Sequence, residues 1–213
     1  MPVRNALEAA VLICPVLFFV AAVGGWVAWR TMQTQRYRHA ITAWSGRRGV
    51  SLLTPHPGVS FEALLDGARM RLGHQNRRVR MGGRRRELWS FQLIADVPTP
   101  MGDLVVRPHH GAIRDLFDSL TQGLRDVQVG DPAFDQAFIV STAHDDAARA
   151  FFTPAMRAAF LEALATARAL GLEEGLSVEG NTVQLRGRGF APVEKLDPAI
   201  ALLARLARAC AGG

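Results

Sequence analysis

The chain has 213 residues, of which 49% are hydrophobic, with a formal net charge of +6 and two cysteines. If one membrane-spanning segment and a linker after it are set aside, about 160 residues remain, which is enough for one ordinary domain with its own core. Cys14 and Cys210 are too few for a disulfide framework, and no cofactor or metal is expected because no ligands cluster at metal-binding spacing.

The first segment is an apolar run from Ala6 to Trp29, in which Glu8 is the single ionisable residue. At about 1.5 Å per residue this run spans roughly 36 Å, enough for a hydrocarbon core of about 30 Å. A cleaved signal peptide has a shorter apolar region, whereas this run stops at Arg30 in the manner of a stop-transfer sequence. The sequence therefore predicts an uncleaved transmembrane anchor within residues 1–30.

Flanking charge predicts the orientation of the anchor. Arg4 and the α-amino group precede the apolar run, and five arginines follow it within about twenty residues: Arg30, Arg36, Arg38, Arg47 and Arg48. By the positive-inside rule, the part after the anchor lies in the cytoplasm. We expect a single-pass protein of the bacterial inner or plasma membrane.

Residues 31–60 are expected to form a juxtamembrane stalk, and 61–213 a soluble domain. Thr31–Trp44 extends the helix, the glycines of Ser45–Gly49 break it, and the prolines of 54–58 indicate a turn.

A block rich in β-strands opens the domain. Ala68–Leu72 and Arg77–Met81 are predicted as a short strand pair. Glu87–Val97 is the strongest strand, because apolar and polar residues alternate along it with the period of a sheet that buries one face. Asp103–Arg107 is expected to return antiparallel to it, with Pro108 ending the ladder.

The second half of the domain mixes helices and strands. Ala112–Leu124 is an amphipathic helix by its spacing, Phe134–Thr142 is predicted as a strand, and Asp145 as the cap of a short helix through Phe151.

The last three elements have clear boundaries. Thr153–Pro154 is an N-cap followed by proline at the first helical position. We expect that helix to bury Met156, Phe160, Ala163, Leu164 and Ala167. Gly180–Asn181 centres a β-hairpin, and Asp197–Pro198 is predicted to open the final helix. The order of elements predicts an α+β fold: one N-terminal transmembrane helix followed by a mostly antiparallel sheet with helices packed on one face.

The sharpest candidate site is a stretch of eight arginines without an acid, expected at a sheet edge or on a protruding hairpin. Its members are Arg69, Arg71, Arg77, Arg78, Arg80, Arg84, Arg85 and Arg86. They could bind anionic lipid headgroups or an acidic protein partner through bidentate hydrogen bonds. Nucleic acid is the weaker alternative, because no aromatic residues are interleaved for base stacking. A solvated strand face in an arginine-rich chain accounts for the pattern more simply than any of these.

Catalytic and metal readings of the remaining residues are weaker than structural ones. His109–His110 near Asp103 lacks metal-ligand spacing, since adjacent residues on a strand point to opposite faces. Four acids flank one segment: Asp131, Asp135, Asp145 and Asp146. They are more simply turn formers and helix caps than an acid–base pair. We expect a non-enzymatic interaction domain at the membrane surface; the alternative is an enzyme of unrecognised chemistry.

One segment resembles a known group of proteins. A G-D-x-x-F-D-x-x-F segment, a later F-T-P and the hairpin LSVEGNTVQL are similar to bacterial membrane proteins in which a domain of unknown function follows one or two N-terminal transmembrane helices. The matching residues are Gly130, Asp131, Phe134, Asp135, Phe138, Phe152, Thr153 and Pro154. The resemblance covers roughly Leu104 to Ala209. It implies the architecture but no activity.

Overall fold

The computed structural model describes residues 2–53, 59–81, 84–97, 102–109, 125–172 and 175–212. Within these ranges, residues 2–17, 76–81, 84–89 and 125 are described by their backbone alone. The chain divides into two compact units, Met1–Trp44 and Ser45–Gly213, and each is described by itself.

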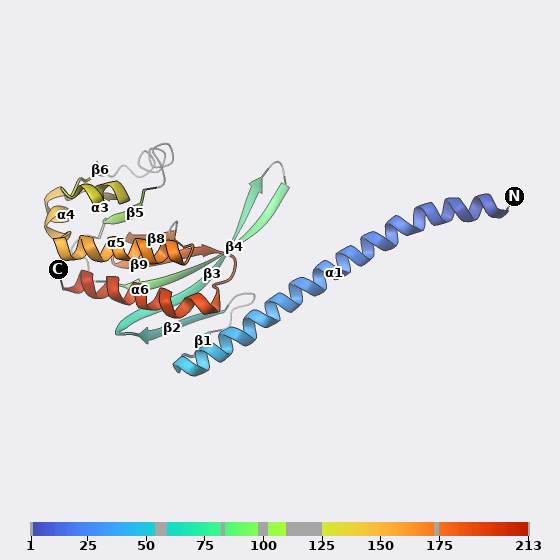
Figure 1. Ribbon diagram of the computed structural model, residues 1–213, viewed down its shortest axis with the longest axis horizontal. Helices are drawn as coiled ribbons and strands as arrows, with labels where there is room; N and C mark the ends of the chain where they lie inside the picture. Colours follow the sequence, from blue (N-terminus) through green and yellow to red (C-terminus); the bar gives the residue numbers. More distant parts are fainter. Residues whose placement is uncertain are drawn as a thin grey trace. The chain divides into compact units, whose positions relative to one another are not determined.

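The first unit consists of one helix. Helix α1 (Pro2–Arg48) has 47 residues and is continuous through Thr31–Trp44, as predicted (Figure 1). It runs through most of the segment expected to break it and ends at Arg48; the next residue, Gly49, has a φ of +66°, which glycine adopts without strain. Among the described residues, no helix combines the length and the apolarity that a membrane crossing requires.

The second unit is an α+β domain, which confirms the predicted fold class of an antiparallel sheet with helices. The nine strands described are β1 (Leu52–Leu53), β2 (Ser60–Leu65), β3 (Ala68–Met81), β4 (Arg84–Asp96), β5 (Val105–Pro108), β6 (Arg125–Asp126), β7 (Phe138–Thr142), β8 (Leu176–Glu179) and β9 (Thr182–Arg188). They form one sheet in the order β1-β2-β3-β4-β9-β8-β5-β7-β6, and every described pair is antiparallel.

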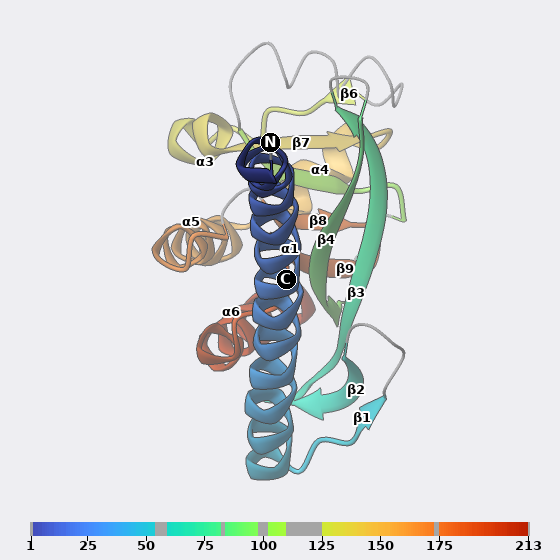
Figure 2. The same cartoon turned by 90° about the vertical axis from the view of Figure 1, so that its right-hand side faces the viewer.

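The described helices of this unit are α3 (Pro132–Ala137), α4 (Asp145–Phe151), α5 (Pro154–Ala169) and α6 (Val193–Ala211). Figure 2 shows α3, α5 and α6 along one side of the sheet, with the strands seen near edge-on. The core lies between these layers, where Leu93 of β4, Leu185 of β9 and Leu203 of α6 are fully buried. The opposite face of the sheet, which we call the polar face, carries the polar positions of the same strands.

Two strand predictions are wrong. Ala68–Met81 is one strand of 14 residues rather than a pair, because the ladder with β4 continues without interruption from Gly73↔Gln92 to Asn76↔Trp89. β5 does not return along β4 but pairs with β7 and β8. The β8–β9 hairpin occupies the place beside β4 instead, where Leu93↔Leu185 continues the buried face.

Three boundaries also differ from the prediction. Phe134 lies in helix α3, and the strand begins only at Phe138, because Asp131 caps a helical turn at this point. The cap position of α4 is His144, so Asp145 is its first residue. Helix α6 begins at Val193 and contains Pro198, because burial of the apolar face of its first turns outweighs the backbone hydrogen bond that proline cannot donate.

The other predictions for this half are confirmed where they are described. Thr153 caps α5 with Pro154 following it, and the five expected core residues of that helix are buried. The hairpin around Gly180–Asn181 has the expected register. The predicted helix Ala112–Leu124 lies outside the described residues.

Candidate functional site

The arginine stretch lies along β3 and β4, and the structure divides it into two parts. Arg71 pairs with β2 on one side and with β4 on the other, and Arg69, at the start of β3, pairs with β2. Arg69 donates through Nε to Glu62 at 2.7 Å, and Arg71 donates to Asp96 at 2.7 Å. Both therefore have a carboxylate partner on a neighbouring strand, which the local sequence did not indicate.

The remaining six arginines lie where β3 and β4 leave the sheet. β2 pairs with β3 only as far as Leu72, and β9 pairs with β4 only from Ser90. Residues 76–81 and 84–89, here called the distal hairpin, form six antiparallel pairs to which no described strand adds a third (Figure 1). The predicted protruding hairpin is confirmed. Its side chains lie outside the described part.

The charge of the distal hairpin is unbalanced. Residues 76–89 contain six arginines and one acid, Glu87, a formal net charge of +5 against +6 for the whole chain. The backbone register places Arg78 opposite Glu87 but Arg80 opposite Arg85. Like charges at opposite positions destabilise a strand pair.

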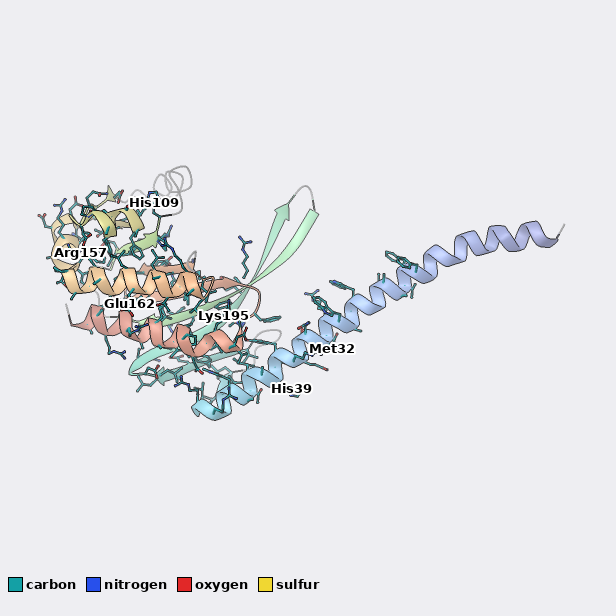
Figure 3. All side chains as sticks on the ribbon, in the orientation of Figure 1. Met32, His39, His109, Arg157, Glu162 and Lys195 are labelled. Atoms are coloured by element: carbon teal, nitrogen blue, oxygen red, sulfur yellow. The ribbon has the colours of Figure 1, made fainter. Side chains whose placement is uncertain are left out.

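Elsewhere in the second unit, most arginines whose side chains are described have a carboxylate nearby. Eight arginines lie no more than 3.8 Å from a carboxylate: Arg48, Arg69, Arg71, Arg107, Arg149, Arg157, Arg186 and Arg205. Figure 3 labels one of their acids, Glu162 on α5, which pairs with Arg205 of α6. The described body of the domain is therefore close to electrically neutral.

A polar network occupies the middle of the polar face. Gln184 of β9 is only 2% exposed there, and its Oε1 accepts from Gln92 and, at 3.0 Å, from Arg186. Arg186 also lies 3.4 Å from Glu179, which Arg107 approaches to 3.8 Å. The network links side chains on four strands, β4, β9, β8 and β5, and its named members include no nucleophile. Sequence reasoning missed Gln184 because a polar residue in an alternating strand predicts exposure.

The acids of the Gly130–Phe138 segment have structural roles. Asp131 caps α3 by accepting from the backbone N–H groups of Ala133 and Phe134 at 3.1 and 3.2 Å. Its carboxylate also lies 3.2 Å from Arg157 of α5 (Figure 3). Asp135 accepts from the N–H groups of the preceding loop at 3.0 and 3.1 Å. Both carboxylates are engaged in holding a turn.

The phenylalanines of the same segment build one aromatic cluster. The ring centroids of Phe134 lie 5.0 Å from Phe138, 5.1 Å from Phe152 and 6.1 Å from Phe160. All four side chains are buried at 3% exposure or less. The residues that carry the resemblance therefore serve as turn, core and helix cap, as their chemistry predicted.

The described side chains around Asp103 and His109 are not arranged as metal ligands. Asp103 accepts from the Ala143 N–H at 2.6 Å and from Thr142 Oγ1 at 3.0 Å. The Ala143 N–H, with help from Thr142, holds the pKa of Asp103 below its usual range. The backbone N–H of His109 donates to Ala137, and His110 lies outside the described residues. Among the described residues, no group of three or more potential ligands is placed to hold a metal ion.

Two further polar side chains were not singled out from the sequence. His74 is half-buried, with Nδ1 2.8 Å from the Val59 carbonyl oxygen; burial lowers its pKa against the opposing effect of that hydrogen bond. Lys195 donates to the Leu170 carbonyl at 2.6 Å and so satisfies the C-terminal end of α5 (Figure 3). A lysine near a helix C-terminus also interacts favourably with the helix dipole.

The fold and these contacts define an α+β domain whose most unusual feature is a cationic two-stranded hairpin. No family model, curated protein sequence or solved structure matches this chain. The similarity to bacterial membrane proteins therefore stays a prediction from the sequence.

Proposed function

We propose that this chain is a single-pass bacterial membrane protein, anchored by residues 6–29, whose C-terminal domain is a non-enzymatic interaction module at the cytoplasmic surface of the inner or plasma membrane. The resemblance of the Gly130–Pro154 region to bacterial membrane proteins is consistent with this proposal.

The observation that carries the proposal is the exposed apolar surface of α1. The side chains of the apolar run are described from Phe18 onward. Seven large apolar residues in this part are at least 44% exposed: Phe18, Phe19, Val20, Val23, Trp26, Val27 and Trp29. A continuous apolar surface of this kind requires a non-aqueous environment or a partner. Residues 6–17 extend the same apolar run in the sequence.

The end of the run supports an interfacial boundary at Trp26–Arg30. The Arg30 guanidinium lies 5.3 Å from the centre of the Trp26 ring, a cation–π contact. Tryptophan and arginine together are typical of the headgroup level of a bilayer. The arginines that follow favour the cytoplasmic side for the domain.

An interaction role is favoured over catalysis by the way the described polar groups are used. Of the acids that could act as an acid–base pair, Asp131 caps a helix and Asp135 holds a turn. In the polar network on the sheet, Arg186 and Glu179 form an ion pair with each other.

Fractionation and a fusion test the proposal. We expect the chain to stay in the membrane pellet after alkaline carbonate extraction. Alkaline phosphatase fused after Gly213 should be inactive, and a cytoplasmically active reporter at the same position should be active. As a matched pair, Phe19→Asp with Val23→Asp should release the chain, whereas Gln33→Asp with Gln35→Asp, outside the apolar run, should not. Extraction of the unaltered chain by carbonate would refute the anchor, and an active phosphatase fusion would refute the cytoplasmic orientation.

A further inference from the structure

The distal hairpin is the part of the domain whose structure most requires a partner. It has six pairs of residues in a ladder of only two described strands. Isolated two-stranded hairpins are marginally stable in water, because they have no third strand or helix to pack against. Persistence of this ladder beyond the sheet therefore favours a second surface that stabilises it.

The chemistry of that surface follows from charge. The hairpin segment holds a formal +5, while the arginines of the body that were described above are paired with carboxylates. A partner that stabilises the hairpin must supply several anions along an extended line. Arginine binds phosphate oxygens in a bidentate manner, which suits a surface dense in phosphates.

From these observations we propose that the distal hairpin binds the phosphate headgroups of anionic lipids through Arg77, Arg78, Arg80, Arg84, Arg85 and Arg86. This inference rests on the proposed membrane anchor, because an anchored domain stays close to the anionic cytoplasmic leaflet. There, each basic residue strengthens attachment about fivefold. Arg69 and Arg71 are excluded from the contact set because Glu62 and Asp96 already neutralise them.

A lipid surface is favoured over nucleic acid for two reasons. The anchor keeps the domain near headgroups at a high effective concentration, which no nucleic acid shares. The hairpin segment also contains a single aromatic residue, Trp89 at its base, whereas single-stranded nucleic acid sites use several aromatic residues for stacking.

The test uses trypsin, because the arginines of the hairpin are themselves cleavage sites. The full chain is reconstituted into vesicles of neutral phosphatidylcholine, or of the same lipid with about one third phosphatidylglycerol, and digested from outside. Cleavage after Arg77 and Arg78 is measured by mass spectrometry relative to cleavage after Arg188, an exposed arginine at the end of β9. We expect this ratio to fall about tenfold in the anionic vesicles at low salt and to recover at ~0.5 M salt, where charge is screened.

Two variants that remove the same number of charges locate the contact. Arg80→Gln, Arg84→Gln, Arg85→Gln and Arg86→Gln together leave Arg77 and Arg78 as reporters and should reduce the protection to less than about twofold. Arg107→Gln, Arg149→Gln, Arg186→Gln and Arg205→Gln together remove four paired arginines from the body and should keep the protection. Equal loss in both variants would assign the effect to net charge and overturn the hairpin as the binding element.

Further samples identify the source of the anion and separate this inference from the anchor. Neutral vesicles with inorganic phosphate, or with a short DNA duplex at matched phosphate concentration, should give no protection; protection as strong as that from anionic lipid overturns the proposal. Each sample is also floated on a density gradient. Absence of protection in chains that float overturns the hairpin contact alone, whereas chains that do not float with neutral vesicles overturn the anchor and, with it, the lipid contact.

Discussion

β3 and β4 pass through two different environments along one continuous ladder. Near the sheet body, Arg69 and Arg71 face carboxylates on adjacent strands, and the opposite side of the same strands is buried beneath helices. In the distal hairpin the same two strands continue with no described strand beside them and with one acid for six arginines. The comparison separates arginines that carboxylates on adjacent strands neutralise from arginines that lie outside the body of the sheet.

The largest expected effect tests whether stability resides in the body. Phe134→Ala removes the ring that contacts Phe138, Phe152 and Phe160, and should lower the free energy of unfolding by about 3–5 kcal/mol. Urea unfolding of the full chain in detergent, followed by circular dichroism, measures this loss. Leu64→Ala, at a side chain that is 76% exposed, is the control and should change stability by less than ~0.5 kcal/mol.

An intermediate effect is expected at the helix caps. Thr153→Ala removes the side-chain oxygen that accepts from the Met156 N–H at 3.3 Å, and should cost about 1 kcal/mol in the same unfolding experiment. Thr153→Ser keeps the acceptor and should restore most of the loss. An equal loss in both variants would mean that the threonine methyl group, rather than the cap, matters at this position.

A pH effect is expected at Asp103, which ties the start of β5 to the end of β7. Because its pKa is lowered in the folded state, its contribution to stability is present above the ordinary aspartate pKa and is lost as the pH falls through the folded value. Asp103→Asn should therefore lower stability at neutral pH and make the decline below about pH 4 shallower. A parallel decline in the variant and the unaltered chain would remove Asp103 as the cause.

The smallest effect is expected at the ion pairs of the surface. Arg205→Gln breaks the contact with Glu162, but both side chains are about half exposed or more, at 49% and 63%. Exposed pairs are screened by water and salt, so the loss should be below ~1 kcal/mol and should vanish at high salt. A larger loss would show that charge pairing stabilises the body far more than burial suggests.

Local chemistry was sufficient wherever an element is defined by its own residues. Thr153–Pro154, the buried stripe of α5 and the Gly180–Asn181 hairpin were all predicted correctly, because caps, helical spacing and two-residue turns depend on neighbours in the sequence. Sequence reasoning failed at α3 and at the first turns of α6. There, capping by Asp131 and burial of an apolar face overrode the expected strand and the proline boundary.

The order of strands was not accessible from the sequence. β5 was expected beside β4 because strands joined by short turns usually pair. In the structure β9 takes that place, since the β8–β9 hairpin offers Val183 and Leu185 to the same buried face as Leu93 and Ala95. The cost of closing the longer loop grows only slowly with its length, so burial decides the neighbour.

Three features were determined by the sequence itself: the apolar run of residues 6–29, the α+β class and the concentration of arginine in β3 and β4. Each depends on composition and spacing along the chain. Only the tertiary structure divided the arginines into two kinds. Glu62 and Asp96 reach Arg69 and Arg71 from neighbouring strands, whereas no strand in the described part of the chain lies beside the ladder beyond Asn76. Whether a charge is neutralised inside the fold depends on which strands lie beside it, and sheet order is a property of the folded chain alone.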